Sequence, residues 1–402
     1  MTGAGARRAI VLVMDGCGVG ALPDADLYGD EGTNTLAHLA DAVGGLELPW
    51  LQSLGLGSIT PIRGVPPAAS PVIHGRLRPL GPGKDSICGH WELMGVLAAH
   101  AAPTYPEGFP GDVIELLRAA TGHELICNRP DSGIAAIEEF GGEHLRSGAL
   151  IAYTSQDSVL QLAAHVERVP VDELYRACAA ARAAMTGEHA VGRVIARPFT
   201  GSEGAFERTD GRMDFAVEPP SRSYLQELQD GGVEVDGVGK IRDLFAGVGV
   251  TRSHPGATNE QAFASVERLL DDLEEGLVFV NLVETDQNYG HRKDISGFER
   301  ALREIDARVG GLMEVLREGD LLVVTADHGV DPTHPGTDHT REYAPLLALT
   351  GAMARERRRG GGASRAAPGE RHDGALADVG ASVLEWLLGV GAPGLPGRSF
   401  II

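Results

Sequence analysis

The chain has 402 residues, which is long for a single hydrophobic core, and its 35 lysines and arginines are outnumbered by 56 aspartates and glutamates. The resulting net charge of -21 repels nucleic acids and anionic membrane surfaces, so it argues against both as partners. Four widely spaced cysteines without a CxxC pair favour reduced thiols, and no apolar run approaches the ~20 residues that span a bilayer. We therefore expect a cytoplasmic protein of two domains.

The first element in chain order is the apolar run at residues 9–14 (AIVLVM), which follows two arginines. It is too short for the hydrophobic region of a secretion signal, and it ends at Asp15. Its composition is typical of a strand that is buried on both faces of a parallel sheet. Asp15 is then a polar residue at the carboxyl end of this strand.

A candidate nucleophile lies in residues 83–95 (GKDSICGHWELMG), where Ser86 follows Lys84 and Asp85 in a turn-forming segment. A metal-bound serine hydroxyl can lose its proton and attack phosphorus, which forms a phosphoserine. An alternative interpretation makes Ser86 a turn or helix-cap residue. Cys88 is a rival nucleophile, although a hydroxyl suits two hard cations better than a thiolate does.

The middle of the chain, residues 100–220, differs in character from its surroundings. It contains a possible strand at 150–154, a helix at 171–185 and an arginine-bearing strand at 191–199. We interpret it as a cap domain inserted into a core. The predicted domains are therefore residues 1–99 and 221–402 for the core and residues 100–220 for the inserted α+β cap.

The second half of the chain predicts strands alternating with helices. Apolar residues at helical spacing follow Asn259, the expected cap, and predict one helix. The same spacing recurs over residues 298–317 and predicts a second helix. This second helix lies between two short apolar runs, residues 277–283 and 321–325, which gives a strand–helix–strand unit. The fold class is thus α/β, with a mainly parallel sheet flanked by helices. Residues 355–371 are rich in glycine and arginine, so we expect a mobile surface loop there.

Carboxylates and imidazoles follow the two later strands. Asp286 and His291 come after the first of them, while Asp327 and His328 come directly after the second and precede His339 beyond a turn rich in proline and glycine. Open α/β sheets bind ligands outside the carboxyl ends of their strands, so these side chains are expected to gather with the aspartate after the first strand.

Carboxylate and imidazole ligands suit manganese, zinc or iron. Each cluster alone can also be read as a polar loop without a metal, but three strand ends with the same kind of ligand favour a pair of metal ions. Glu284, His334 and Asp338 lie nearby and are assigned supporting or structural roles. The candidate ligands are Asp15, Asp286, His291, Asp327, His328 and His339.

Motifs along nearly the whole chain resemble those of the phosphopentomutase family. They are MDGCGVG, GKDSICGHWELMG, YTSQDSVLQLAAH, VGRVIARPF, VGKIRDLF and TADHGVDPTHPGTDHTREY. The resemblance implies an alkaline-phosphatase-like core with an inserted cap. It also implies an isomerase that interconverts ribose 1-phosphate and ribose 5-phosphate, and the 2-deoxyribose equivalents, with two Mn²⁺ ions.

The resemblance also implies roles for individual residues. One manganese is assigned to Asp286, His291 and His339, and the other to Asp15, Asp327 and His328. Ser86 is the phosphorylated residue and contacts both metals. Its phosphoryl group is transferred to the pentose phosphate, which forms a sugar bisphosphate as the intermediate. Glucose 1,6-bisphosphate or a similar compound phosphorylates the enzyme initially.

Substrate contacts are expected mainly from the cap, which should hold the sugar and its distal phosphate and exclude water. Guanidinium groups grip phosphate in bidentate fashion, whereas surface salt bridges are the alternative role for any single arginine. Arg197 is a further cation of this kind. The favoured substrate contacts are Ser155, Asp157, Arg193, Arg208 and Lys240.

The sequence departs from the family at four positions. Ser86 and Cys88 stand where the family commonly has threonine, and the family's usual Asp-Phe-Asp appears here as Glu284, Thr285 and Asp286. A metal-dependent phosphatase or another phosphosugar mutase is the nearest rival, and a noncatalytic phosphosugar-binding protein is a more distant one. The choice between ribose and deoxyribose, the metal used in cells and the oligomeric state are left open.

Overall fold

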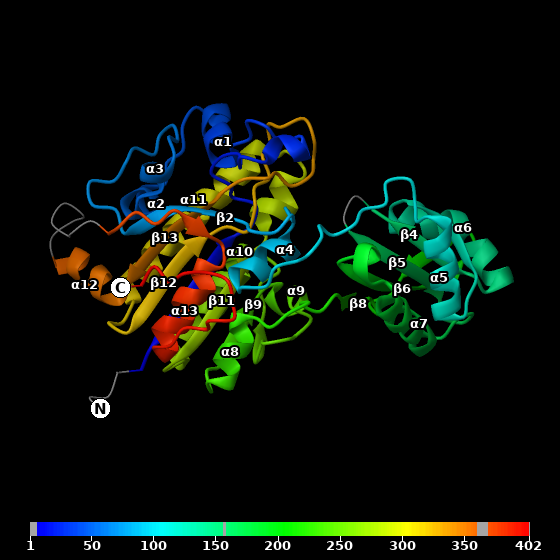
Figure 1. Ribbon diagram of the computed structural model, residues 1–402. Helices are drawn as coiled ribbons and strands as arrows, with labels where there is room; N and C mark the ends of the chain where they lie inside the picture. Colours follow the sequence, from blue (N-terminus) through cyan, green and yellow to red (C-terminus); the bar gives the residue numbers. More distant parts are fainter. Residues whose placement is uncertain (1–5, 156–157, 360–368, 402) are drawn as a thin grey trace. The chain divides into compact units, whose positions relative to one another are not determined.

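The structure is a computed structural model that describes residues 6–155, 158–359 and 369–401. The chain divides into two compact units (Figure 1). The first unit is formed by Met1–Ala99 together with Pro219–Ile402, and the second by His100–Glu218. The second unit is thus inserted into the sequence of the first, and its role as a cap stays a prediction.

The first unit is built on an eight-stranded sheet whose strands run in the order β10-β9-β11-β1-β12-β13-β2-β14. The five strands from β10 to β12 are parallel, whereas β13 is antiparallel to both of its neighbours. This confirms the predicted α/β class. The strands are β1 (Arg8–Met14), β2 (Ile73–Arg78), β9 (Val235–Val238), β10 (Arg252–His254), β11 (Gly276–Leu282), β12 (Asp320–Thr325), β13 (Ala344–Thr350) and β14 (Gly374–Ala375).

The three apolar runs of the sequence form β1, β11 and β12, and all residues of these strands are buried. β1 lies between the other two, with Val13 level with Asn281 on one side and with Thr325 on the other. Because the three strands are parallel and in this register, the residues that follow them emerge at one edge of the sheet. This edge carries the candidate metal ligands.

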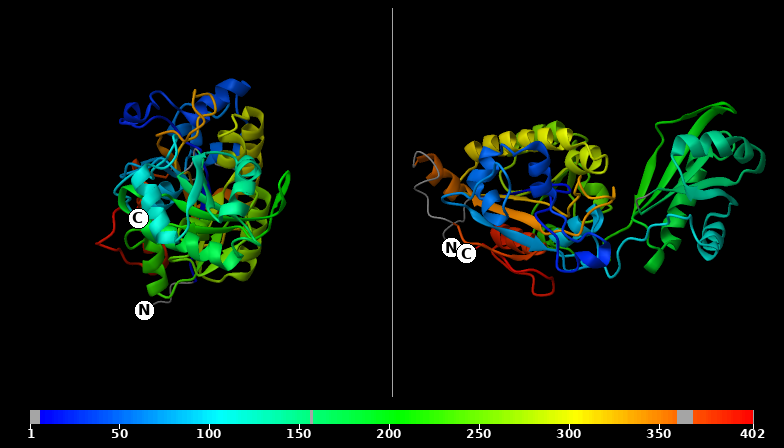
Figure 2. Two further views of the ribbon diagram at one scale, coloured as in Figure 1. Left: turned by 90° about the vertical axis from the view of Figure 1, so that its right-hand side faces the viewer. Right: turned by 90° about the horizontal axis from the view of Figure 1, so that it is seen from above.

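Helices cover both faces of this sheet (Figure 2). α10 and α11 lie on one face and α13 on the other. The helices of this unit are α1 (Thr35–Val43), α2 (Pro49–Leu54), α3 (Leu56–Ile59), α4 (Ser86–Leu93), α8 (Tyr224–Asp230), α9 (Ile241–Leu244), α10 (Asn259–Asp272), α11 (Ile295–Val315), α12 (Gly351–Arg359) and α13 (Asp378–Leu388), with a short 3₁₀ turn η1 (Ala25–Tyr28). Among the described residues, every helix is too short or too polar to traverse a bilayer.

Two expectations about the helices were wrong. The cap of α10 is Thr258, whose hydroxyl accepts a hydrogen bond from the Gln261 amide at 3.2 Å. Asn259 is instead the first helical residue, and its side chain accepts a hydrogen bond from the Glu284 amide at 3.3 Å. The predicted loop at 355–371 is wrong over 355–359, which belong to α12, while 360–368 lie outside the described residues.

The arginines of α12 explain why this segment is helical despite its low apolar content. Arg357 is buried, and its guanidinium donates to the backbone carbonyls of Ser53 and Ser70. Arg358 donates to the carbonyls of Met313 and Leu316 at the end of α11. These arginines therefore donate hydrogen bonds to backbone carbonyls of neighbouring elements. The charge of the segment alone did not reveal these contacts.

The second unit contains a six-stranded mixed sheet in the order β3-β4-β5-β6-β7, with β8 paired to β6. Alternate residues of β4 point to opposite faces, so Leu150 joins the apolar core beneath α5 and α7, while Tyr153 joins the one beneath α6. The predicted strand at 150–154 and helix at 171–185 are confirmed. The elements are β3 (Leu125–Pro130), β4 (Leu150–Thr154), β5 (Val159–His165), β6 (Arg193–Ser202), β7 (Ala205–Arg208), β8 (Met213–Ala216), α5 (Gly111–Thr121), α6 (Gly133–Ser147), α7 (Val171–Ala184) and the turn η2 (Gly187–His189).

Candidate metal centre

The carboxylate of Asp15 lies directly after β1 and is held from the neighbouring strand. The Asn281 side-chain amide on β11 donates to Asp15 Oδ2 at 2.7 Å, and the Thr285 hydroxyl donates to the Asp15 carbonyl at 2.6 Å. Sequence reasoning missed Asn281 as a site residue. The feature that could have identified Asn281 is that it is the single polar residue within the apolar run at 277–283.

Asp327 and His328 follow β12 and are both buried. Asp327 Oδ2 lies 3.2 Å from His328 Nε2 and 3.0 Å from Nδ1 of His90 on α4. Asp327 Oδ1 accepts hydrogen bonds from the amides of Gly16 and His328. His90 was not predicted as a site residue, and it reaches the candidate ligand Asp327 from α4.

Asp286 lies in a short π-helical turn, η3 (Thr285–Gly290), that follows β11. Its Oδ1 is 3.4 Å from Nε2 of His291 and 3.4 Å from Nε2 of His339. The ring of His339 also lies against that of His328, with centroids 4.2 Å apart. Nδ1 of His291 is 2.6 Å from the Thr337 carbonyl, which fixes the orientation of this ring.

All six candidate ligands therefore lie in one cluster. Two sets of three have ligand atoms within 4.8 Å of one another, and His328 belongs to both. One set is Asp15, Asp327 and His328, which are the ligands expected for one ion. The other set is Asp286, His328 and His339, in which His328 stands where His291 was expected. How the six ligands divide between two ions stays a prediction.

Two buried oxygens in this cluster fit a bound cation. Within the described residues, Asp286 Oδ1 and Asp327 Oδ2 lie 3.0–3.4 Å from imidazole nitrogens but accept no hydrogen bond of good geometry. Buried carboxylate oxygens that are incompletely hydrogen-bonded are costly, and a divalent cation compensates for them. The donors are carboxylate oxygens and imidazole nitrogens, which manganese, zinc and iron accept. The residues present thus fit divalent metal ions.

Charge pairing decides the protonation of these groups. Burial alone would raise the pKa of Asp286, but His339 and His291 hold it below its ordinary value. The pKa of Asp327 is likewise lowered, because His328 and His90 outweigh its burial. Burial would lower the pKa of His328, yet Asp327 and Asp15 raise it. A cation entering the cluster therefore meets the ionised carboxylates of Asp286 and Asp327 and competes with a proton for the His328 imidazole.

Ser86 is the first residue of α4, and its hydroxyl points at this cluster. Its Oγ donates to Asp15 Oδ1 at 3.3 Å and lies 3.1 Å from His328 Nε2. The helix cap is Asp85, whose carboxylate accepts from the Ile87 and Cys88 amides at 3.0 and 3.1 Å. The alternative interpretation of Ser86 as a helix cap was therefore wrong.

The turn before Ser86 is held from the segment that carries His339. Arg341 donates to the Gly83 carbonyl at 2.7 Å, and Lys84 pairs with Asp30 at 2.9 Å and with Asp338 at 3.4 Å. Neither Arg341 nor Asp30 was predicted as a site residue. The contact between Arg341 and Gly83 joins residues 258 positions apart in sequence, and the pair of Lys84 and Asp30 joins residues 54 positions apart.

The expected substrate residues are found in both units. Ser155, Arg193 and Arg208 belong to the second unit, and Lys240 precedes α9 in the first. Arg193 pairs with Asp214 at 3.6 Å. Asp157 lies outside the described residues. The structure describes each unit by itself, so the assembly of these residues into one substrate site stays a prediction.

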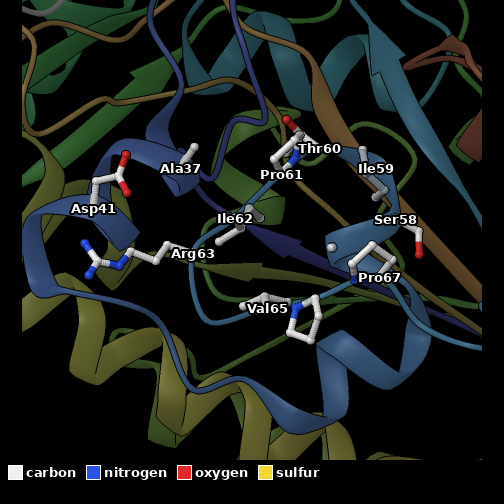
Figure 3. Close-up of a pocket in the computed structure, with 12 residues that line it drawn as sticks. Ala37, Asp41, Ser58, Ile59, Thr60, Pro61, Ile62, Arg63, Val65 and Pro67 are labelled. Carbon is white, nitrogen blue, oxygen red and sulfur yellow. The ribbon is translucent and has the colours of Figure 1, made fainter.

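A pocket of about 660 Å³ lies elsewhere in the first unit (Figure 3). Residues of α1, of α3 and of the segment 60–67 line it, including Asp41 and Arg63. No candidate metal ligand is among its 12 lining residues. The chemistry therefore belongs to the ligand cluster at the sheet edge and not to this pocket.

Comparisons with known proteins indicate the family of this chain. The family model described as "Metalloenzyme superfamily" matches residues 7–389. A phosphopentomutase of Carboxydothermus hydrogenoformans is 50% identical over 342 residues, which cover 85% of this chain and 88% of the relative. A phosphopentomutase of Desulfitobacterium hafniense is 44% identical over 382 residues, which cover 95% of this chain and 96% of the relative.

Among solved structures, a phosphoglycerate mutase of Leishmania mexicana, determined at low cobalt concentration, has a similar fold. Its TM-score is 0.50 and its sequence identity 15%, with 99% of this chain and 98% of that chain covered. At this identity the likeness concerns the fold alone.

Proposed function

The chain belongs to the phosphopentomutase family of the metalloenzyme superfamily, and we propose that it interconverts ribose 1-phosphate and ribose 5-phosphate, and the 2-deoxyribose equivalents, through a phosphoserine at Ser86. It is an enzyme of the mutase type that uses divalent metal. The observation that carries the proposed mechanism is the position of the Ser86 hydroxyl, which touches both Asp15 and His328 in the ligand cluster.

We propose two Mn²⁺ ions, one held by Asp15, Asp327 and His328 and the other by Asp286, His291 and His339. Bound there, two metal ions polarise a phosphate and stabilise charge on both the attacking and the leaving oxygen. The incompletely hydrogen-bonded oxygens of Asp286 and Asp327 support the binding of a cation at each of these carboxylates.

Ser86 carries the phosphoryl group between the two positions of the sugar. Its phosphoester transfers the phosphoryl group to the free hydroxyl of the pentose phosphate, the bond between phosphorus and the serine oxygen breaks, and the proton of the sugar hydroxyl passes to that serine oxygen. The products are a sugar bisphosphate and the serine hydroxyl. This hydroxyl then attacks the other phosphate, and its proton passes to the sugar oxygen that leaves, which restores the phosphoserine and releases the isomer. In the unphosphorylated state, the serine hydroxyl donates a hydrogen bond to Asp15 Oδ1. The amino-terminal end of α4, where Ser86 lies, favours the negative charge of the phosphate.

The second unit is proposed to close the site as a cap, because water at the phosphoserine would convert the mutase into a phosphatase. Its Ser155, Asp157, Arg193 and Arg208, with Lys240 of the first unit, are the proposed contacts to the sugar and its other phosphate. Glucose 1,6-bisphosphate, or a similar sugar bisphosphate, is proposed to supply the first phosphoryl group. The proposed location is the cytoplasm, and the oligomeric state is not part of the proposal.

Phosphorus NMR of the manganese-loaded protein with ribose 1-phosphate tests this function. We expect conversion to ribose 5-phosphate that depends on a catalytic amount of glucose 1,6-bisphosphate. Release of inorganic phosphate instead would identify a metal-dependent phosphatase. No change in the spectrum would favour another phosphosugar mutase or a noncatalytic binding protein, which a panel of other phosphosugars distinguishes.

A further inference from the structure

The amino-terminal end of α6 in the second unit is built to receive an anion. α6 (Gly133–Ser147) has 15 residues, and its first turn leaves backbone amides that have no partner within the helix. The hydroxyl of Ser132 satisfies one of them, the Ala135 amide, at 3.2 Å. The remaining amides and the helix dipole place partial positive charge at this end, which favours phosphate groups.

Tyr153 places an unused hydroxyl at the same point. The residue is fully buried, and within the described residues its hydroxyl has no hydrogen-bond partner. The hydroxyl faces the start of α6, because a Cβ added to Gly133 would lie 2.4 Å from it. A buried hydroxyl without a partner is unfavourable, so its presence here indicates a group that the hydroxyl binds. Burial raises the pKa of Tyr153, so the hydroxyl keeps its proton and can donate it.

Arg208 supplies the positive charge. Its Nη2 would lie 2.6 Å from the same Cβ position on Gly133, so the guanidinium and the Tyr153 hydroxyl meet at one helix end. Within the described residues, Arg208 forms no ion pair, whereas Arg193 and Arg212 both pair with Asp214, at 3.6 and 2.6 Å. Among the residues that the structure describes, Arg208 is therefore a cation without an ion pair, placed beside the Tyr153 hydroxyl.

We propose that the Tyr153 hydroxyl, the first amides of α6 and the Arg208 guanidinium together bind a phosphate monoester. The inference rests on the proposed function and deepens it, because the ligand is the phosphate of the pentose phosphate that is not being transferred. Arg208 was expected from the family resemblance, whereas Tyr153 and the α6 terminus were not. Arg208 is exposed on β7, so its guanidinium can turn toward an arriving phosphate and uncover the hydroxyl. Gly133 keeps this approach open because it has no side chain.

Isothermal titration calorimetry with the metal-free full chain tests the site, since the metal centre then contributes no phosphate affinity. Ribose 5-phosphate and inorganic phosphate are the two probes. We expect Tyr153→Phe to weaken the binding of both probes by about tenfold, because the substitution removes one hydrogen bond to a charged group. The control is Tyr175→Phe, which removes the hydroxyl that donates to the Gly211 carbonyl at 2.8 Å in the same unit and should leave the affinity unchanged.

Thermal unfolding separates this role from a structural one. Because Tyr153→Phe removes a hydroxyl that is unpartnered without ligand, its melting temperature should equal or exceed that of the wild type while its phosphate affinity falls. Gly133→Ala places a methyl group against both Tyr153 and Arg208 and should weaken phosphate binding as well.

Each outcome bears on one proposal. Wild-type affinity in Tyr153→Phe overturns the phosphate site, as does a wild-type chain that binds neither probe. If the wild type binds phosphate and Tyr153→Phe does not, but the wild type converts no pentose phosphate, the proposed function fails and the phosphate site stands.

Discussion

The hydroxyl oxygen of Ser86 lies 3.1 Å from Nε2 of His328, although 242 residues separate them in sequence. His328 is also the one residue that belongs to both sets of clustered ligands. The proposed nucleophile therefore sits beside the residue that joins the two proposed metal positions. This arrangement separates metal binding from phosphoryl transfer, because Ser86 can be changed while the six ligands remain.

Ser86→Ala should retain bound manganese but lose mutase turnover, by about 10³-fold or more if the serine is the nucleophile. Ser86→Thr keeps a hydroxyl at the same atom and is the matched control, with activity expected within about tenfold of the wild type. Metal content by elemental analysis and turnover by phosphorus NMR are the measurements. Undiminished turnover in Ser86→Ala would remove Ser86 from the mechanism.

Removal of metal should destabilise the protein, because within the described part of the chain the buried oxygens Asp286 Oδ1 and Asp327 Oδ2 then keep only ion-pair contacts to imidazoles and no hydrogen bond of good geometry. Metal present at about 1,000 times its dissociation constant contributes about 4 kcal/mol to the free energy of unfolding. Chelation followed by differential scanning calorimetry should therefore lower the melting temperature, and added manganese should restore it. An unchanged melting temperature would mean that the cluster binds no metal in the wild-type chain.

Asn281 is expected to increase the metal affinity of the centre by orienting Asp15, to which it donates a hydrogen bond at 2.7 Å. Asn281→Ala removes the group that orients this ligand, and such changes typically reduce metal affinity or activity about 10–100-fold. Manganese titration measures the affinity. Gln229→Ala, which removes a 3.3 Å hydrogen bond from α8 to Thr251 Oγ1 outside the ligand cluster, is the control and should bind metal nearly as the wild type does.

The sequence revealed the metal centre largely because its strands are buried on both faces. Such strands appear as continuous apolar runs, so a carboxylate that ends the run, such as Asp15 after β1, stands out. The loops bearing His291 and His339 could be proposed as ligand segments because each follows such a strand. The family resemblance then added the phosphoserine, which no periodicity indicates.

The contacts that position the ligands were not predictable in the same way. His90 reaches Asp327 from a helix 237 positions earlier in the chain, and Arg341 reaches Gly83 across 258. These contacts depend on how distant segments pack, which local patterns do not encode. The loop predicted at 355–359 was wrong for a related reason, since Arg357 and Arg358 donate hydrogen bonds to carbonyls of other elements.

Arg8 should be important for stability at the opposite end of β1. Its guanidinium pairs with Asp320 through bonds of 2.8 and 2.7 Å, and both side chains are only 1% exposed. Arg8→Met leaves a buried carboxylate without its partner, so we expect the free energy of unfolding to fall by about 3–5 kcal/mol. Urea denaturation measures it. The control Arg7→Met removes a partly buried arginine that stacks on Trp386 and should cost about 1 kcal/mol.

Asp236 should make the stability of the sheet edge depend on pH. This buried carboxylate on β9 accepts hydrogen bonds from Arg252 at 2.8 and 2.9 Å and lies 2.7 Å from His254 Nε2 on β10. Burial would raise the pKa of Asp236, but Arg252 and His254 together lower it. A carboxyl whose pKa is lower in the folded state stabilises the protein above its unfolded pKa of about 3.9, and this contribution is lost as the pH falls through the folded value.

Asp236→Asn should therefore reduce the free energy of unfolding by about 1–2 kcal/mol at pH 7, a modest value because the Arg252 side chain is 45% exposed. The difference from the wild type should stay constant down to about pH 5 and shrink below about pH 4, since the wild-type carboxylate then takes up a proton. Urea denaturation of both proteins at several pH values measures it. A difference that grows toward acid pH would contradict the assigned direction of the Asp236 pKa shift.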